Sequence, residues 1–157
     1  MLQITDLVKI YEGGVLALDK VSFEVPKGQF VAVIGLSGSG KSTLLRCINR
    51  LIDPTAGKVI WDGIDVTALT EEDLLVVRRK IGMVFQHFNL VSRSSVLTNV
   101  LAGRLGYVNP AWSLANRFPK DDVDKAMRQL ERVSIADKAN YRADELSGGQ
   151  QQRVGIA

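Results

Sequence analysis

The first part of the chain shows two different patterns of apolar residues. Apolar and polar residues alternate over residues 21–25. This period of two is typical of a strand with one buried face. We therefore expect strands over residues 2–11 and 15–25, joined at Gly13-Gly14.

Two other runs, residues 30–34 and 81–85, are apolar with little interruption. Such runs are typical of strands that are buried on both faces. After the first run, Leu44, Ile48 and Leu51 recur at helical spacing. The pattern predicts a buried strand, a loop and then a helix, with a second buried strand later in the chain.

Turn and capping residues mark the middle of the chain. Asp62-Gly63 predicts a hairpin within residues 58–66. Thr70, followed by Asp73, resembles a capping box with Asp in place of the usual Glu or Gln. It predicts a helix whose acidic start and basic end suit the helix dipole and lie on a solvated face.

The second half of the chain is expected to be mainly helical. Residues 97–105 predict a helix, and residues 106–120, which include Pro110, Trp112 and Pro119, predict an irregular connection that faces a partner. A further helix begins at Asp121, and its apolar positions form a single stripe typical of a core face. These positions are Val123, Ala126, Met127, Leu130 and Val133.

Composition limits the classes of function. A length of 157 residues suits one domain. A net charge of +3 suits a polyphosphate ligand or an anionic membrane surface, but it is too small to indicate binding to nucleic acid. The single cysteine, Cys47, excludes an internal disulfide and a multi-cysteine metal site, and we expect it to be a core thiol. The sequence has neither an apolar run of membrane-spanning length nor a signal peptide, so we expect a cytoplasmic protein.

Residues 35–42 read G-x-x-x-x-G-K-S, the pattern of a phosphate-binding loop. Glycines let successive backbone N–H groups point inward at an anion, and the following helix directs its positive end to the same place. In such a loop Lys41 reaches the β- and γ-phosphates, and the Ser42 hydroxyl ligates Mg²⁺. The alternative is a glycine- and serine-rich turn that merely precedes a lysine.

Three polar or aromatic residues have two interpretations each. Gln86 ends an apolar strand, where it could reach a metal or an attacking water, although alone it would be interpreted as a loop glutamine. Tyr11 could stack on a purine ring or simply pack. His87, the only histidine, has no visible partner and is interpreted as a surface or packing residue.

A second glycine-containing corner lies at residues 146–150, Leu-Ser-Gly-Gly-Gln. Ser147 is a candidate N-cap, and a helix is expected to continue from Gln150 towards the last residue. Two glycines at a helix N-terminus form another anion-binding corner. Since one domain seldom needs two such corners, the second could serve a phosphate bound by another subunit.

Residues 35–43, Gln86 and residues 146–150 together resemble the ATP-binding subunit of ATP-binding-cassette (ABC) transporters. The resemblance implies an α/β, P-loop NTPase fold: a RecA-like parallel core with an N-terminal antiparallel β subdomain within residues 1–92, and a helical signature subdomain over residues 93–157. It implies that Gln86 and Lys41 are catalytic, with Gln86 positioning water and metal, that Ser42 binds the same metal, and that further residues bind the nucleotide. Those in the same subunit are Tyr11, Gly35, Leu36, Ser37, Gly38, Ser39, Gly40, Lys41, Ser42 and Thr43, and those acting on the ATP of the other subunit are Ser147, Gly148, Gly149 and Gln150.

The family implies ATP and Mg²⁺ as cofactors and a head-to-tail dimer with ATP between two subunits. It also implies transmembrane permease subunits, an indirect periplasmic solute-binding partner, no nucleic acid, and a peripheral position on the cytoplasmic side of the bacterial inner membrane. Residues 49–90 look like amino-acid, methionine and phosphonate importers alike. Residues 103–107 and 112–118 most resemble phosphonate importers, so we expect phosphonate import.

The sequence departs from the family at its end, because the family continues after residue 157 with the Walker B aspartate, a catalytic glutamate and a switch histidine. We therefore expect an incomplete domain that does not hydrolyse ATP alone, although the full protein does. A smaller departure is Gly155, where the family usually has alanine.

Three other functions are alternatives to phosphonate import: a truncated binding module, an amino-acid or methionine importer, and a cassette ATPase of DNA repair or translation. A P-loop kinase or GTPase does not explain residues 146–150.

Overall fold

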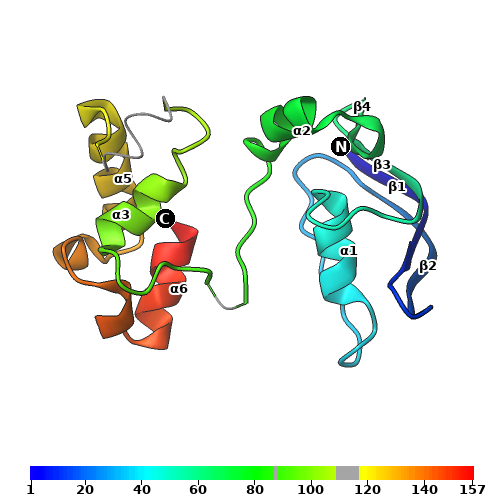
Figure 1. Cartoon of the computed structure of the whole chain (residues 1–157), viewed down its shortest axis with the longest axis horizontal. Coiled ribbons are helices and arrows are strands. Elements are labelled where there is room, and N and C mark those ends of the chain that lie inside the picture. Colours follow the sequence, from blue (N-terminus) through cyan, green and yellow to red (C-terminus); the bar gives the residue numbers. More distant parts are fainter. Residues whose placement is uncertain (87, 109–116) are drawn as a thin grey trace. The chain divides into compact units, whose positions relative to one another are not determined.

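The computed structural model describes residues 1–86, 88–108 and 117–157, which form two compact units, Met1–Ile81 and Gly82–Ala157 (Figure 1). Each unit is described by itself. The interpretation of His87, and most of the irregular connection with Pro110 and Trp112, lie outside the described residues. The predicted boundary after residue 92 stays a prediction.

The first unit is built on an antiparallel sheet with the strand order β2-β1-β3-β4. The sheet comprises β1 (Leu2–Ile10), β2 (Leu16–Val25), β3 (Ala56–Trp61) and the short β4 (Ile64–Asp65). Both N-terminal strands are thus confirmed, and so is the hairpin at Asp62-Gly63. Asp62 has a φ of 47° and Gly63 a φ of 83°, the left-handed pair that a tight hairpin turn requires.

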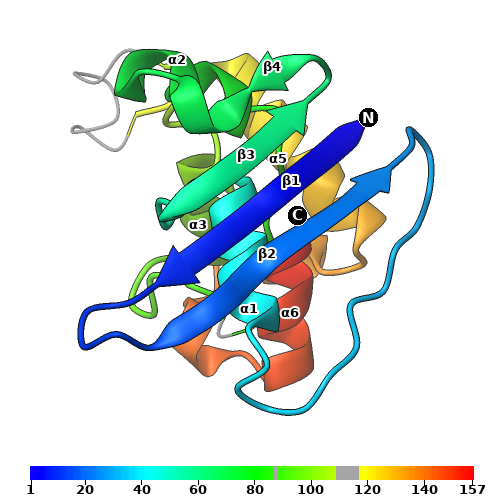
Figure 2. The same ribbon diagram turned by 90° about the vertical axis from the view of Figure 1, so that its right-hand side faces the viewer.

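One face of this sheet carries the core of the first unit. Helix α1 (Lys41–Ile48) lies behind β1, β2 and β3 in Figure 2 and buries Leu44 and Cys47. Because side chains alternate along a strand, the sheet residues that meet this helix come from one face. The buried cluster consists of Ile4, Leu7, Leu18, Leu44, Cys47, Val59, Val66, Leu74 and Val77.

The predicted capping at Thr70 is present at the start of α2 (Glu71–Arg78), which follows the short η1 turn (Val66–Ala68). The Thr70 hydroxyl accepts a hydrogen bond from the Asp73 N–H at 3.2 Å and donates one to the Asp73 carboxylate at 2.8 Å. The helix buries Leu74 and Val77 and keeps its acidic start exposed. The local pattern therefore predicted both the start of this helix and its solvated face.

The two buried strands predicted at residues 30–34 and 81–85 are not formed. Phe30 is 94% exposed and Ile34 is 92% exposed, and neither run is assigned to a strand. A strand needs a hydrogen-bonding neighbour, and within the described residues neither run has one. Apolar composition identifies segments suited to burial, but it does not identify the strands that would pair with them.

The second unit is helical and contains α3 (Val96–Ala102), α5 (Lys120–Arg132) and α6 (Gly148–Ile156), with short turns η2 (Ala136–Lys138) and η3 (Ala143–Glu145) (Figure 1). The predicted stripe of α5 is confirmed as a core face, since Ala126 and Leu130 are buried and Met127 and Val133 pack on the core. Helix α3 ends at Ala102, three residues before the predicted end at residue 105, and hydrogen-bonded turns follow it.

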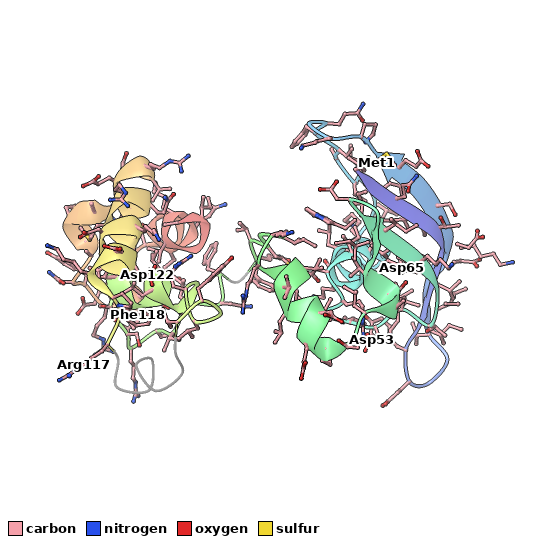
Figure 3. All side chains as sticks on the ribbon, turned by 90° about the horizontal axis from the view of Figure 1, so that it is seen from above. Met1, Asp53, Asp65, Arg117, Phe118 and Asp122 are labelled. Atoms are coloured by element: carbon pink, nitrogen blue, oxygen red, sulfur yellow. The ribbon has the colours of Figure 1, made fainter. Side chains whose placement is uncertain are left out.

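One buried ion pair lies near the start of α5. Asp122 is 6% exposed and accepts a hydrogen bond from Arg104 Nε at 2.9 Å (Figure 3). Lys125 Nζ lies 3.7 Å from the same carboxylate. Burying a carboxylate is costly without such partners, so the bonds hold residues 103–107 against α5. The Arg104 guanidinium also lies 4.2 Å from the centre of the Tyr107 ring.

Candidate functional site

The phosphate-loop backbone depends on glycine at a position of close approach. Gly40 has a φ of 88°, a left-handed value that side chains disfavour. A Cβ added there would lie 2.3 Å from the Ala17 carbonyl oxygen on β2. The glycine therefore allows the loop to pass directly against the sheet before the helix begins.

The start of the loop lies close to a side chain of the same loop. A Cβ added at Gly35 would lie 2.6 Å from Ser39 Oγ, so the loop curls until its two ends meet. The Ser39 N–H donates to the Leu36 carbonyl at 3.2 Å and closes a turn inside the curl. The predicted loop thus exists as a compact curl, although the strand expected before it does not.

Lys41 folds back over this curl. Its Nζ atom donates hydrogen bonds to the carbonyl oxygens of Gly35 at 2.8 Å and Leu36 at 2.7 Å, and lies 3.4 Å from Ser39 Oγ. The side chain is half-buried, whereas most of the loop is exposed. A positive charge is therefore held at the loop by neutral acceptors, which leaves it uncompensated for an incoming anion.

The helix that follows the loop is not capped by a side chain within the described part of the chain. Gly40 is the N-cap of α1, and its carbonyl accepts the Leu44 N–H at 2.8 Å. The first N–H groups of a helix have no partner inside the helix and carry its positive dipole. Ser42 is exposed in this first turn and Thr43 is half-buried, so both lie where a phosphate and its metal would be bound.

Tyr11, which directly follows β1, contacts the first turn of the same helix. Its hydroxyl lies 3.1 Å from the Thr43 hydroxyl. Sequence analysis proposed Tyr11 and Thr43 separately and did not predict this contact. The two residues are 32 positions apart, and no local periodicity could reveal their proximity.

Gln86 belongs to the second unit and is exposed in a turn. The Phe88 N–H donates to the Phe85 carbonyl at 3.1 Å and closes this turn, in which Phe88 and Asn89 have positive φ values. The position is a loop position, as the simpler interpretation expected. Its contact with a metal or water stays a prediction.

Ser147 caps α6 as predicted, and it does so reciprocally. Its Oγ accepts the Gln150 N–H at 3.4 Å, and its own N–H donates to Gln150 Oε1 at 2.9 Å. A Cβ added at Gly148 or Gly149 would meet nothing within 4 Å. The second corner is therefore a capped helix start whose two glycines border open space.

Sequence analysis did not identify the residue that supports this corner, Gln151. Its Nε2 donates to the carbonyl oxygens of Ala143 and Leu146, both at 3.1 Å. The preceding segment is also paired: the Ala143 N–H donates to the Ser94 carbonyl at 3.0 Å. The only sequence feature that pointed to this role was a polar residue directly after the glycine corner. That feature did not distinguish Gln151 from its polar neighbours.

Other features of the described residues do not add a second site. A shallow pocket of about 350 Å³ in the first unit is bordered by Asp53 and Asp65 (Figure 3), but Asp53 binds Arg50 Nε at 2.8 Å and Asp65 accepts the Thr67 N–H at 3.0 Å. The described ranges contain no cluster of three acidic, histidine or cysteine side chains that could hold a metal. Nor does any helix in them have the length and apolarity needed to cross a membrane.

Cys47 is confirmed as a core residue. Its side chain is fully buried in the described structure. Burial disfavours the thiolate and so raises the pKa of this thiol. A thiol that stays protonated inside the core is unreactive, as expected for a packing residue.

Two curated proteins resemble this chain closely. The phosphonates import ATP-binding protein PhnC of Staphylococcus haemolyticus (strain JCSC1435) is 53% identical over 157 residues, covering 99% of this chain and 61% of the relative. PhnC 2 of Synechococcus sp. (strain JA-2-3B'a(2-13)) is 55% identical over 157 residues, covering 100% of this chain and 58% of the relative. The chain thus spans about 60% of the length of these curated relatives.

A solved structure shares the fold. The ATP-binding cassette MJ0796, in a dimeric post-hydrolysis state bound to ADP and Pi, has a TM-score of 0.86 and 36% identity, covering 99% of this chain and 67% of its own. The fold is therefore α/β and of the P-loop NTPase class. Residues 18–157 match the ABC transporter family. Together with the phosphate loop and the capped glycine corner, this match shows that the chain belongs to the ABC transporter family.

Proposed function

We propose that the protein carrying these residues is the ATP-binding and ATP-hydrolysing subunit of a bacterial importer, and that the solute is a phosphonate. The phosphate-loop corner carries the first part of the proposal. Lys41 is held at the loop by neutral carbonyls, and the first N–H groups of α1 are not capped by a side chain among the described residues. The names of the PhnC relatives support the second part.

Each site residue has a proposed role. Residues 35–43 bind the phosphates, Tyr11 stacks on adenine, and Lys41 neutralises the β- and γ-phosphates. The exposed hydroxyl of Ser42 and the amide oxygen of Gln86 suit Mg²⁺, which prefers oxygen ligands. When bound, Mg²⁺ neutralises phosphate charge, while Gln86 orients the attacking water.

The signature residues Ser147, Gly148, Gly149 and Gln150 act in this proposal on ATP held by a second copy of the chain. The cassette of known structure is dimeric, which supports the association of two copies; the head-to-tail arrangement is part of the proposal. Permease subunits and, indirectly, a periplasmic solute-binding protein complete the transporter. The subunit then lies peripherally on the cytoplasmic side of the inner membrane. Residues 1–92 form its β subdomain and core, and residues 93–157 form its signature subdomain.

Binding and turnover are separable in this chain. None of the proposed site residues is a carboxylate or a histidine, the groups most often used as the general base in hydrolysis. We therefore propose that the 157 residues bind ATP and that steady turnover requires the longer protein. Turnover by the purified 157-residue chain that disappears in Lys41→Ala would contradict this part.

The binding proposal is tested by titrating the chain with fluorescent ATP and Mg²⁺. Lys41→Ala should weaken binding by at least about tenfold, because hydrogen bonds to a charged group contribute about 1.5–3 kcal/mol. Lys58→Ala, which removes an exposed lysine from β3, is the matched control and should bind normally. Equal binding by all three proteins would refute the phosphate-loop assignment, and thermal unfolding of each variant would show that it is folded.

A further inference from the structure

The Tyr11 backbone is held by hydrogen bonds on both sides of the residue. Its N–H donates to the Val15 carbonyl at 2.9 Å, and its carbonyl accepts the Gly14 N–H at 3.0 Å. The end of β1 is fixed as well, because the Ile10 N–H donates to Thr55 Oγ1 at 2.9 Å. The main chain that carries the ring is therefore a closed turn anchored to the sheet.

The far end of the Tyr11 side chain is also held. Its hydroxyl lies 3.1 Å from Thr43 Oγ1, in the first turn of α1. The Lys9 ammonium donates to the Asp53 carbonyl at 2.8 Å and lies 5.4 Å from the centre of the Tyr11 ring. The ring remains partly open, with Tyr11 36% exposed.

We infer that the Tyr11 hydroxyl is a positioning group: through Thr43 it sets the distance between the ring that stacks on the purine and the loop that binds the phosphates. The inference rests on the proposed function, and it goes further by assigning a role to the hydroxyl, which stacking alone does not need. A phenylalanine ring can stack equally well, but it cannot bond to Thr43. The pair therefore favours a ligand that carries a base and a polyphosphate at a fixed separation.

The physical basis is preorganisation. A ring that is already held in one rotamer loses little freedom when a base stacks on it. Without the hydroxyl bond the ring samples other rotamers, and ATP binding must then order it. Removing the hydroxyl should weaken ATP binding about three- to tenfold, the range expected for one hydrogen bond or one immobilised side chain.

The test compares ATP with inorganic tripolyphosphate, which has phosphates but no base, by calorimetric titration of the 157-residue chain. Tyr11→Phe should bind ATP about three- to tenfold more weakly and tripolyphosphate as the unchanged chain does. Tyr141→Phe is the control, because Tyr141 is a tyrosine of the second unit whose ring also lies near a lysine ammonium, that of Lys138 at 4.2 Å. It should leave both affinities unchanged.

A double-mutant cycle with Thr43→Val tests the pair itself. If the two hydroxyls act together, adding Tyr11→Phe to Thr43→Val should weaken ATP binding less than about twofold further. ATP affinity unchanged in Tyr11→Phe, or equal losses for ATP and tripolyphosphate, would overturn the inference while the proposed function stands. If the chain without substitutions binds neither ATP nor tripolyphosphate, both the inference and the proposed function are overturned.

Discussion

Two helices of this chain begin at glycine-containing corners, and the two corners satisfy their backbone groups differently. At α1 the N-cap is Gly40, with a φ of 88°, and it makes no side-chain cap bond among the described residues. At α6 the N-cap is Ser147, with an ordinary φ of −64°, and it exchanges two hydrogen bonds with Gln150. One corner has no side-chain cap and depends on the left-handed conformation of a glycine, and the other is capped by two reciprocal hydrogen bonds.

This difference separates two ways of preparing a helix start for an anion. Among the described residues no side chain caps the α1 corner, and Lys41 adds a positive charge there, so the corner suits a phosphate. The α6 corner already satisfies the Ser147 and Gln150 N–H groups internally. It is stable without a ligand, which suits the proposed role of contacting a phosphate that another copy binds.

The largest expected contrast is between Gly40→Ala and Gly149→Ala. Gly40→Ala places a side chain at a left-handed φ and 2.3 Å from the Ala17 carbonyl, so we expect a loss of about 2–4 kcal/mol in the free energy of unfolding. Gly149→Ala meets open space in a helical turn and should leave stability unchanged or raise it by up to about 1 kcal/mol. Urea unfolding of both variants measures the difference, and similar losses would show that the two corners are equivalent.

A smaller effect is expected at the α6 cap. Ser147→Ala removes the acceptor of the Gln150 N–H and should lower the free energy of unfolding by about 1 kcal/mol. ATP binding by the monomeric chain, measured at low protein concentration, should not change, because Ser147 is proposed to act on ATP in another copy. Urea unfolding and the fluorescent-ATP titration measure the two effects.

Ser147→Asp is the matched control for this cap. Aspartate caps a helix about as well as serine, so stability should return. If Ser147→Ala instead weakened ATP binding by the monomeric chain without unfolding it, the assignment of this corner to a second copy would be contradicted.

The parts of the structure that were predicted correctly depend on neighbours in sequence. The Asp62-Gly63 turn, the Thr70 cap and the Ser147 cap each follow from residues within four positions, and all three are present. The strands predicted at residues 30–34 and 81–85 failed because pairing depends on a neighbouring strand that the local pattern does not specify. The phosphate loop was recognised from its spacing.

Contacts that support the candidate site were missed for the same physical reason. The hydroxyls of Tyr11 and Thr43 meet across 32 positions of sequence, and the Gln151 side chain reaches back eight positions to the Ala143 carbonyl. Neither the hydrophobic periodicity nor the residue types predict which residues distant in sequence will contact each other. Sequence analysis could therefore nominate site residues one by one but could not predict how they hold one another.

The smallest effect concerns a third glycine, inside α6 rather than at its start. Gly155 has no left-handed φ, and a Cβ added there would lie 3.7 Å from both Phe88 Cβ and the Phe88 carbonyl, an ordinary contact. Gly155→Ala should therefore raise the free energy of unfolding by about 0.5–1 kcal/mol, the usual advantage of alanine over glycine in a helix. Gly103→Ala, whose Cβ would lie 3.3 Å from the Val100 carbonyl at the end of α3, is the control and should gain less. A loss of stability in Gly155→Ala would mean that α6 needs flexibility or close packing at this turn, and the contrast between an uncapped and a capped helix start would then be incomplete.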